Sequence, residues 1–255
     1  MITFYYDKTF EGLLTALFDA YDRKQFPDHL VGEEEVEPLF TEETHYVITE
    51  NRKAGRVWKG LAKKLEKNVC NMLFYVWLSE LPEREMLLLR YMRKVFDNPH
   101  FAATDFTDDD ILQVSKIAHK VSKERLFIIQ FVRFQKAADD IFFAPVAPQY
   151  NALPLAISHF VNRFADQKWV IYDLKRKYGY YYNLQKVAEI TLEDDTHLLG
   201  GKLDEAMMAE DEKLFQELWR GYFKSMTIKE RINPKLQRQH MPRRFWKYLT
   251  EKTES

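Results

Sequence analysis

Apolar positions recur at intervals of three and four residues through most of the first half of the chain, which is the spacing of one face of an α-helix. The clearest helix follows a short β-like run at 2–6 and ends before Pro27. Its apolar face consists of Phe10, Leu13, Leu14, Leu17, Phe18 and Tyr21. Further helices are predicted over 51–67, 71–81, 83–96 and 107–122, with a short strand at 44–49. We therefore expect a mainly helical N-terminal region over 1–125.

The last of these helices begins with residues that can close its first turn. Thr107 is expected to cap it, Asp110 to bond back to the cap, and Phe106 to pack against Ile111.

The pattern changes at residue 126, where runs rich in Phe, Ile, Val and Tyr replace the helical spacing. Strands are predicted over 126–134, 141–147, 169–172, 178–182 and 187–192, with a hairpin turn at 138–140. Between the second and third strands, Asn151 is expected to cap a helix. Its inner face is Leu153, Ile157, Phe160, Val161 and Phe164. The ββαββ order over 126–192 predicts a small antiparallel sheet packed against helices, and hence an α+β fold.

Charge divides the C-terminal region, 193–255, into an acidic and a basic part. Residues 193–217 hold nine acids and two bases, whereas residues 220–249 hold nine bases and one acid. A long helix is predicted over 203–224, and a basic tail follows. The two blocks could pair with each other or face different partners. We expect the three regions to form one compact unit.

Composition excludes several classes of protein. Of the 255 residues, 46% are hydrophobic and 15% aromatic, which is typical of a globular protein, and the net charge of −1 gives no global attraction to nucleic acid or membranes. The single cysteine, Cys70, excludes an intramolecular disulfide and a multi-cysteine metal site. The N-terminus lacks a signal-peptide pattern, and the longest apolar run, 72–78, is too short to span a bilayer. A cytoplasmic protein without membrane contact is expected.

No motif identifies a catalytic residue. The chain lacks the GxxxxGK[ST], GxGxxG and GxSxG patterns, its seven histidines have no paired spacing, and no pair of acids is singled out as a general acid and base. We therefore expect no metal and no cofactor, and catalytic residues stay unknown. An enzyme is not excluded, but a non-enzymatic role is favoured.

The main candidate for nucleic-acid contact is the C-terminal segment, where guanidinium groups suited to phosphates alternate with rings on which bases could stack. The candidate residues there are Arg231, Arg238, Arg243, Arg244, Trp246 and Lys247. The alternative is that the rings anchor the tail to the core while the cations stay solvated.

Two further groups are candidates. Arg163, Lys175 and Arg176 could form a second basic surface, although a basic turn is usually only solvated, and Arg133, His159 and Asp173 form a possible polar site. Seven bases over 51–67 oppose only Glu66, so that helix presents either a solvated lysine face or a phosphate-binding one.

Several stretches resemble a bacterial family of probable DNA metabolism or repair proteins of unknown mechanism. They are YYDKTFEGLLTALFDAYDRK near the N-terminus, FFAPVAPQYNALPLAISHFVNRFADQKWVIYDLKRKYG in the middle, and LWRGYFKSMTIKERINPKLQRQHMPRRFWKYLTEK near the end. The resemblance implies a role beside other proteins. Relatives occur next to a putative radical-SAM DNA-modification protein with a helix-hairpin-helix element, or fused to a uracil-DNA-glycosylase-like domain.

Neither activity carries over to this chain. One cysteine cannot supply the three thiolates of a radical-SAM cluster, and no glycosylase water-activating loop is recognisable. The leading expectation is a DNA-binding accessory protein that works with a partner radical-SAM or glycosylase-type enzyme. The alternatives are an adaptor that docks that enzyme without touching DNA, and a cryptic enzyme on damaged nucleic acid that uses His159, Asp173 and Arg176.

Overall fold

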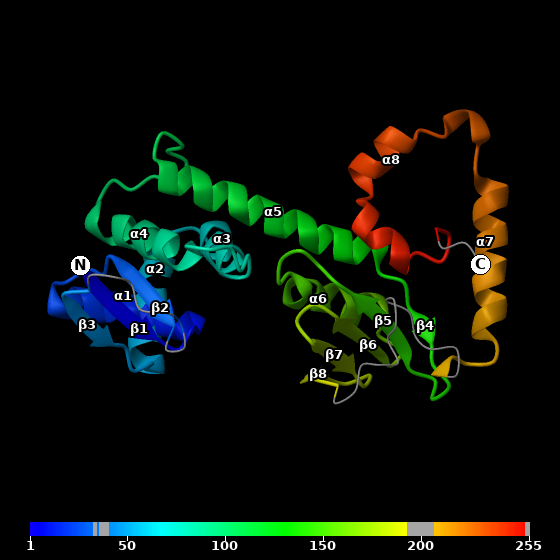
Figure 1. Cartoon of the computed structure of the whole chain (residues 1–255), viewed down its shortest axis with the longest axis horizontal. Coiled ribbons are helices and arrows are strands. Elements are labelled where there is room, and N and C mark those ends of the chain that lie inside the picture. The colour runs from blue at the N-terminus through cyan, green and yellow to red at the C-terminus, as the bar shows by residue number, and fades with distance from the viewer. Residues whose placement is uncertain (33–34, 36–40, 193–206, 253–255) are drawn as a thin grey trace. The chain divides into compact units, whose positions relative to one another are not determined.

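The computed structural model describes residues 1–32, 35, 41–192 and 207–252. Where the sequence suggested one unit of three regions, the contacts divide the chain into two compact units (Figure 1). Unit 1 is Met1–Ser122 and unit 2 is Lys123–Ser255. Helix α5 (Asp109–Phe131) contributes its first part to unit 1 and its last part to unit 2.

Unit 1 contains a three-stranded parallel sheet that the sequence analysis did not anticipate. Strand β1 (Ile2–Tyr6) lies between β2 (His29–Gly32) and β3 (Glu43–Tyr46) and is parallel to both. Parallel neighbours need a crossover connection. The helix predicted after β1 supplies it: α1 (Phe10–Arg23) begins at Thr9, whose hydroxyl accepts a hydrogen bond from the Gly12 backbone N–H at 2.9 Å.

The remaining helices of unit 1 enclose one apolar core with α1. They are α2 (Asn51–Lys64), α3 (Lys67–Trp77), α4 (Arg84–Asp97) and the first part of α5. Leu13, Leu61, Leu73 and Leu88 are fully buried in this core. The three- and four-residue spacing of apolar positions therefore predicted these helices correctly, with ends that differ by a few residues.

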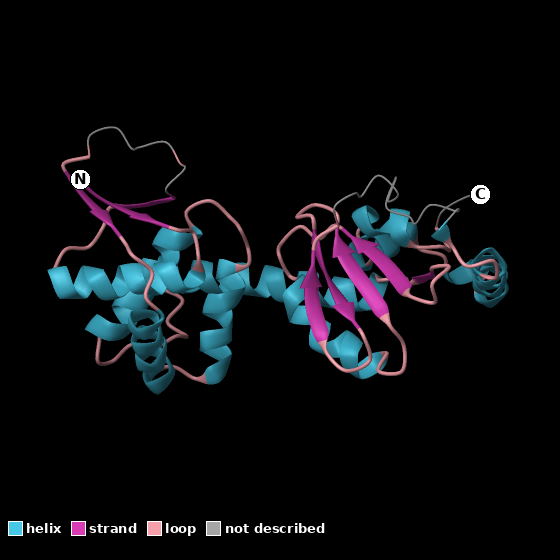
Figure 2. Ribbon diagram, turned by 90° about the horizontal axis from the view of Figure 1, so that it is seen from below, coloured by secondary structure: helices cyan, strands magenta, loops and turns pink. Residues whose placement is uncertain are grey.

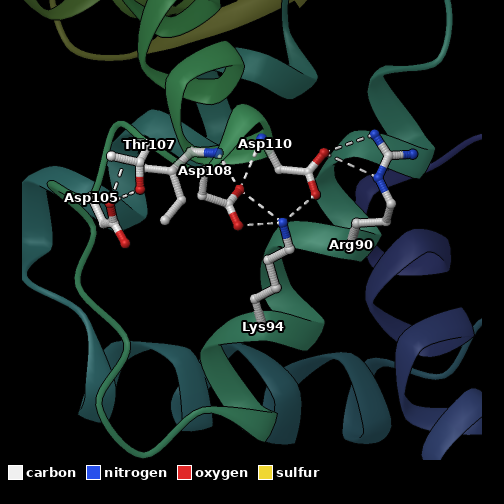
Figure 3. A network of polar contacts seen from close by, with 7 residues as sticks. Arg90, Lys94, Asp105, Thr107, Asp108 and Asp110 are labelled. Atoms are coloured by element: carbon white, nitrogen blue, oxygen red, sulfur yellow. Dashed lines mark hydrogen bonds and ion pairs between the residues drawn. The ribbon is translucent and has the colours of Figure 1, made fainter.

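The entry to α5 differs from the predicted capping arrangement. Asp108 accepts hydrogen bonds from the backbone N–H groups of Asp110 (2.9 Å) and Ile111 (3.2 Å), while the Thr107 hydroxyl bonds to Asp105 (Figure 3). Lys94 of α4 explains the change, because its ammonium group bonds to Asp108 at 2.6 Å and to Asp110 at 2.7 Å. Phe106, which was expected to pack against Ile111, is about half exposed.

Unit 2 contains a five-stranded sheet (Figure 2), whose strands are labelled in Figure 1 and follow the order β4-β5-β6-β7-β8. Its strands are β4 (Gln135–Lys136), β5 (Phe142–Val146), β6 (Trp169–Asp173), β7 (Tyr178–Tyr182) and β8 (Val187–Ile190). The α+β class is confirmed, but the sheet is mixed, because β5 and β6 are parallel. Helix α6 (Leu153–Arg163) connects those two strands, and a helical crossover returns the chain in the same direction.

The predicted strand at 126–134 is wrong, since α5 continues to Phe131 and only Gln135 and Lys136 pair with β5. Phe127 and Phe131 are one helical turn apart, and their rings stack with centroids 5.9 Å apart. Their composition favours a strand, but packing of this face against the C-terminal segment overrides that preference.

The cap predicted for α6 is also wrong, because Ala152 precedes the helix and no side chain caps it. Asn151 instead accepts a hydrogen bond from the Tyr178 hydroxyl at 2.5 Å, which ties the start of α6 to β7.

The chain continues through α7 (Glu212–Met226), the short 3-10 helix η3 (Lys229–Arg231), α8 (Pro234–His240) and the 3-10 helix η4 (Arg243–Tyr248). The second half of the helix predicted over 203–224 is therefore part of α7. The first residues of that predicted helix, 203–206, lie outside the described residues. Five residues of the acidic block do as well: Glu193, Asp194, Asp195, Asp204 and Glu205.

Candidate nucleic-acid interface

The C-terminal segment of unit 2 is anchored by its apolar side chains. Phe245 and Leu249 are buried against Phe127 and Phe131 of α5, with the Phe245 ring 5.7 and 5.5 Å from those two rings. Trp246 is half-buried, and its indole N–H donates to the Met241 carbonyl at 3.0 Å. Part of the aromatic sequence is therefore an anchor, as the alternative interpretation held, and the cations between the rings must be considered one by one.

Arg244 is one of three candidate arginines that neutralise a buried carboxylate inside unit 2. It forms an ion pair with Glu124, whose side chain is 2% exposed and also accepts the Gln149 backbone N–H at 2.7 Å. The guanidinium lies 4.9 Å from the Phe245 ring centroid. Arg244 therefore already has a partner in the fold.

Arg176 plays the same role for Asp173, which is fully buried. Its Nη1 lies 2.9 Å from Asp173 Oδ2 and donates to the Pro148 carbonyl at 3.2 Å. The Lys175 backbone N–H donates to Asp173 at 2.9 Å, and its ammonium donates to the Gln149 carbonyl at 3.2 Å. These three predicted site residues therefore hold the β6–β7 turn onto the preceding loop.

Arg133 and Trp219 share the carboxylate of Glu251, which is 3% exposed. Arg133 Nη2 lies 2.9 Å from Oε1, and the Trp219 indole N–H donates to Oε2 at 3.0 Å. Burial alone would raise the pKa of Glu251, but these hydrogen bonds, a backbone N–H and the positive charge of Arg133 together hold that pKa below its usual range.

His159 lies on α6 with its ring edge-to-face on Phe160, at 5.4 Å between centroids. Among the described residues, no hydrogen bond or ion pair joins His159 to Asp173 or Arg176. The structure therefore does not assemble these three groups into a hydrogen-bonded cluster of the kind that the cryptic-enzyme hypothesis needs.

The other candidate cations have no carboxylate within ion-pair distance among the residues that the structure describes. They are Arg163, Arg231, Arg238, Arg243 and Lys247, and all five are exposed. Arg243 lies 5.9 Å from the Trp246 ring, Lys247 lies 4.8 Å from the Tyr248 ring, and Arg163 lies 5.7 Å from the Phe164 ring. A guanidinium or ammonium group held beside a ring in this way remains available to a phosphate.

A cavity of about 840 Å³ adds a stacking surface beside one of these cations, Arg163. Five rings line it, from Phe134, Phe142, Phe164, Phe215 and Trp219. Arg133 and Arg163 also line the cavity, and only the former has a carboxylate partner among the described residues. Lys136, the third cation, bonds to Asp140 at 3.0 Å and lies 3.8 Å from Asp211.

Sequence reasoning selected Arg133 and Arg163 but missed the aromatic cavity that they share. The five rings are spread over 85 positions of the chain, from Phe134 to Trp219, so their local spacing does not indicate a common site. The one available indication was the position of Phe134 and Phe164, each directly following a candidate arginine.

The basic helix of unit 1 is partly neutralised. Lys53 bonds to Asp19 at 3.0 Å and to Glu50 at 2.8 Å, and Lys64 donates to the backbone carbonyls of Val95 and Phe96. A second cavity in unit 1, of about 540 Å³, lies beside the Lys94 network, where acids and bases neutralise one another.

Across the described ranges, no group of three or more His, Cys, Asp or Glu side chains is placed to hold a metal ion, and no helix is both long and apolar enough to cross a bilayer.

No curated protein and no solved structure matches the chain. One family model does match, over residues 82–251, and its description is a domain of unknown function, DUF4130. The match runs from the residues before α4 to Glu251, which pairs with Arg133, and so includes the whole set of candidate residues in unit 2. Because it covers more than half of the sequence, the chain belongs to the DUF4130 family.

Proposed function

We propose that unit 2 binds single-stranded nucleic acid, and that the chain is an accessory protein of DNA metabolism that acts beside a separate modifying or repair enzyme. The observation that carries the proposal is the combination of unpaired cations with an aromatic cavity. Arg163 is an exposed guanidinium on the wall of a cavity lined by five rings. Proteins that bind single strands combine these same elements, because phosphates attract the cations and unpaired bases stack on the rings.

The candidate cations divide into paired and unpaired ones, and the unpaired ones extend the proposed contact surface beyond the cavity. Arg133, Arg176 and Arg244 are each held by a buried carboxylate, so a phosphate would have to compete with an internal partner. The five unpaired cations have no such competitor among the described residues. We therefore assign phosphate contact to those five and a supporting role to the three paired arginines.

The resemblance to DNA metabolism proteins supports the accessory role. That resemblance implies relatives beside a putative radical-SAM protein or fused to a glycosylase-like domain, an arrangement that would leave the chemistry to another polypeptide or domain. The residues of this chain would then hold the strand while the partner enzyme acts on it.

A salt titration of the full chain with a labelled single-stranded oligonucleotide, followed by fluorescence anisotropy, tests the proposal. Log Kd should rise linearly with log salt concentration, because each phosphate contact releases counterions. The double variant R243Q/K247Q should reduce the slope by about 1.4, at about 0.7 per contact. A dissociation constant above about 10⁻⁴ M at low salt, or a binding curve independent of salt, would contradict the proposal.

A second candidate function, an adaptor without nucleic-acid contact, is favoured by one observation. Helix α7 exposes seven large apolar side chains: Leu214, Phe215, Leu218, Trp219, Tyr222, Phe223 and Met226. A surface of this kind is typical of protein interfaces. In the adaptor case the oligonucleotide would not bind, while a partner protein would.

A further inference from the structure

Helix α7 and the segment that follows it form an apolar groove in unit 2. The groove has a volume of about 650 Å³ and lies between the end of α7, η3 and α8, which are orange to red in Figure 1. Its apolar lining consists of Phe223, Met226, Ile228, Ile232 and Leu236. This volume falls within the usual range of binding pockets.

The groove is built by regular local structure. Asn233 caps α8, since its side-chain oxygen accepts the Leu236 backbone N–H at 3.0 Å, and Pro234 takes the first helical position. At the other end of α8, the Met241 N–H donates to the Gln237 carbonyl at 2.8 Å. Helix α8, which presents Leu236, is therefore fixed at both ends, which favours a preformed binding surface.

The charged side chains that line the groove are basic. Arg231 and Lys252 line it together with His240, and no acid lines it among the described residues. The Lys252 ammonium is held 5.9 Å from the Phe223 ring and 5.1 Å from the Trp246 ring. A ligand with an apolar face flanked by carboxylates would meet complementary groups at both the lining and the rim.

The aliphatic lining separates this groove from the aromatic cavity. Four of its five apolar lining side chains, Met226, Ile228, Ile232 and Leu236, are aliphatic and only Phe223 has a ring, whereas the cavity beside Arg163 has five rings on which bases could stack. Aliphatic grooves instead accept the leucine, isoleucine or phenylalanine side chains of an amphipathic helix, spaced at i, i+3, i+4 and i+7.

We propose that this groove docks an acidic amphipathic helix of a partner protein, with apolar anchors between α7 and α8 and carboxylates facing Arg231 and Lys252. The inference goes beyond nucleic-acid contact and does not depend on it. The apolar residues of the groove are absent from the proposed phosphate contacts, and Arg231 is the residue that the two surfaces share.

A synthetic peptide provides the probe. Its sequence carries leucines at i, i+3, i+4 and i+7 with glutamates elsewhere, and a control peptide replaces every glutamate by lysine. We expect the acidic peptide to bind the full chain at micromolar concentration and at least ten times more tightly than the basic one. Equal binding of the two peptides, or no binding of the acidic peptide below 1 mM, overturns the proposal.

Matched variants locate the binding site. Leu236 lines the groove and is 50% exposed, while Leu214 lies at the other end of α7, outside the groove, and is 57% exposed. L236S should weaken binding of the acidic peptide at least tenfold, as expected for loss of an anchor. L214S should weaken it less than twofold. Equal effects of the two variants would place the peptide elsewhere and overturn the proposal.

The oligonucleotide separates the two proposals. R243Q/K247Q should weaken binding of the oligonucleotide and leave binding of the acidic peptide unchanged. L236S should weaken binding of the acidic peptide and leave binding of the oligonucleotide unchanged. If L236S weakened the oligonucleotide as strongly as the peptide, the groove would be a nucleic-acid site and the assignment to a protein helix would be wrong.

Discussion

The Lys94 network of unit 1 and the C-terminal basic segment of unit 2 are both rich in charge, but in the second only Arg244 is neutralised by a buried carboxylate among the described residues. Lys94 lies between Asp108 and Asp110, and Arg90 bonds to Asp110 through two nitrogens, at 2.9 and 3.1 Å. In unit 2, Arg231, Arg238, Arg243 and Lys247 face solvent without a carboxylate partner among the described residues. A count of charged residues along the chain is therefore a poor guide to a binding surface. Whether each charged side chain has a partner inside the fold determines whether it is available to a ligand.

The same contrast exists inside unit 2. Arg176 and Arg163 lie 13 positions apart and were grouped as parts of one possible basic surface. Arg176 is held by the fully buried Asp173, whereas Arg163 faces an aromatic cavity. One of them supports the fold and the other is free to contact a ligand.

The largest expected effect comes from removing a paired arginine. R176M leaves the Asp173 carboxylate buried without its cation, which should lower the free energy of unfolding by about 3 kcal/mol. The matched variant R163M removes an exposed, unpaired guanidinium and should change it by less than about 0.5 kcal/mol. Urea denaturation followed by tryptophan fluorescence compares the two. Equal losses would show that pairing does not distinguish these residues.

A smaller loss of stability is expected in unit 1 when the pH is lowered. Hydrogen bonds from Lys94 hold the pKa of Asp108 below its usual range; burial alone would raise the pKa of Asp110, but Arg90 and Lys94 outweigh it and lower that pKa too. Carboxylates with depressed pKa values stabilise the fold above their ordinary pKa, and this contribution is lost as pH falls through the depressed values.

The double variant D108N/D110N should therefore lower stability by roughly 1 to 2 kcal/mol at neutral pH and flatten the decline on acidification. Thermal unfolding between pH 7 and pH 2 measures both effects. A wild-type curve as flat as that of the variant would show that the network contributes nothing.

The smallest effect concerns affinity. R163Q should weaken binding of a single-stranded oligonucleotide about fivefold, because it removes one phosphate contact. It should also reduce the slope of log Kd against log salt concentration by about 0.7. R93Q is the control, since Arg93 is half-exposed but pairs with Asp97 at 3.2 Å, and a surface pair of this kind contributes little to stability. If R93Q and R163Q weakened binding equally, the distinction between paired and unpaired arginines would fail.

Local periodicity predicted most elements, but not how they pair. The helix at 10–21 and the strands at 169–172 and 178–182 were found from the spacing of apolar residues, because each buries one face. The error at 126–134 arose where Phe127, Ile128 and Phe131 satisfy both a strand composition and a helical spacing. Whether these residues form a helix or a strand depends on their packing against Phe245, more than 110 positions later. A local stretch of sequence therefore does not contain the information that favours the helix.

The candidate surface was predictable only in outline for the same reason. The cations and rings of the C-terminal segment are visible in the sequence. Their availability depends on Glu124 and Glu251, and the ion pair that holds Arg244 joins residues 120 positions apart. Charge pairing across such a distance is a property of the folded unit.

The burial of Phe245 and Leu249 against Phe127 and Phe131 has a consequence for synthesis of the chain on the ribosome. Translation proceeds from the N-terminus at about 5–20 residues per second, so α5 emerges several seconds before the segment that covers its aromatic face. Until residues 245–251 leave the exit tunnel, this face stays uncovered and Arg133 has no partner in Glu251. Unit 1 can fold during translation, whereas unit 2 can complete its packing only after its last helical turn has been released.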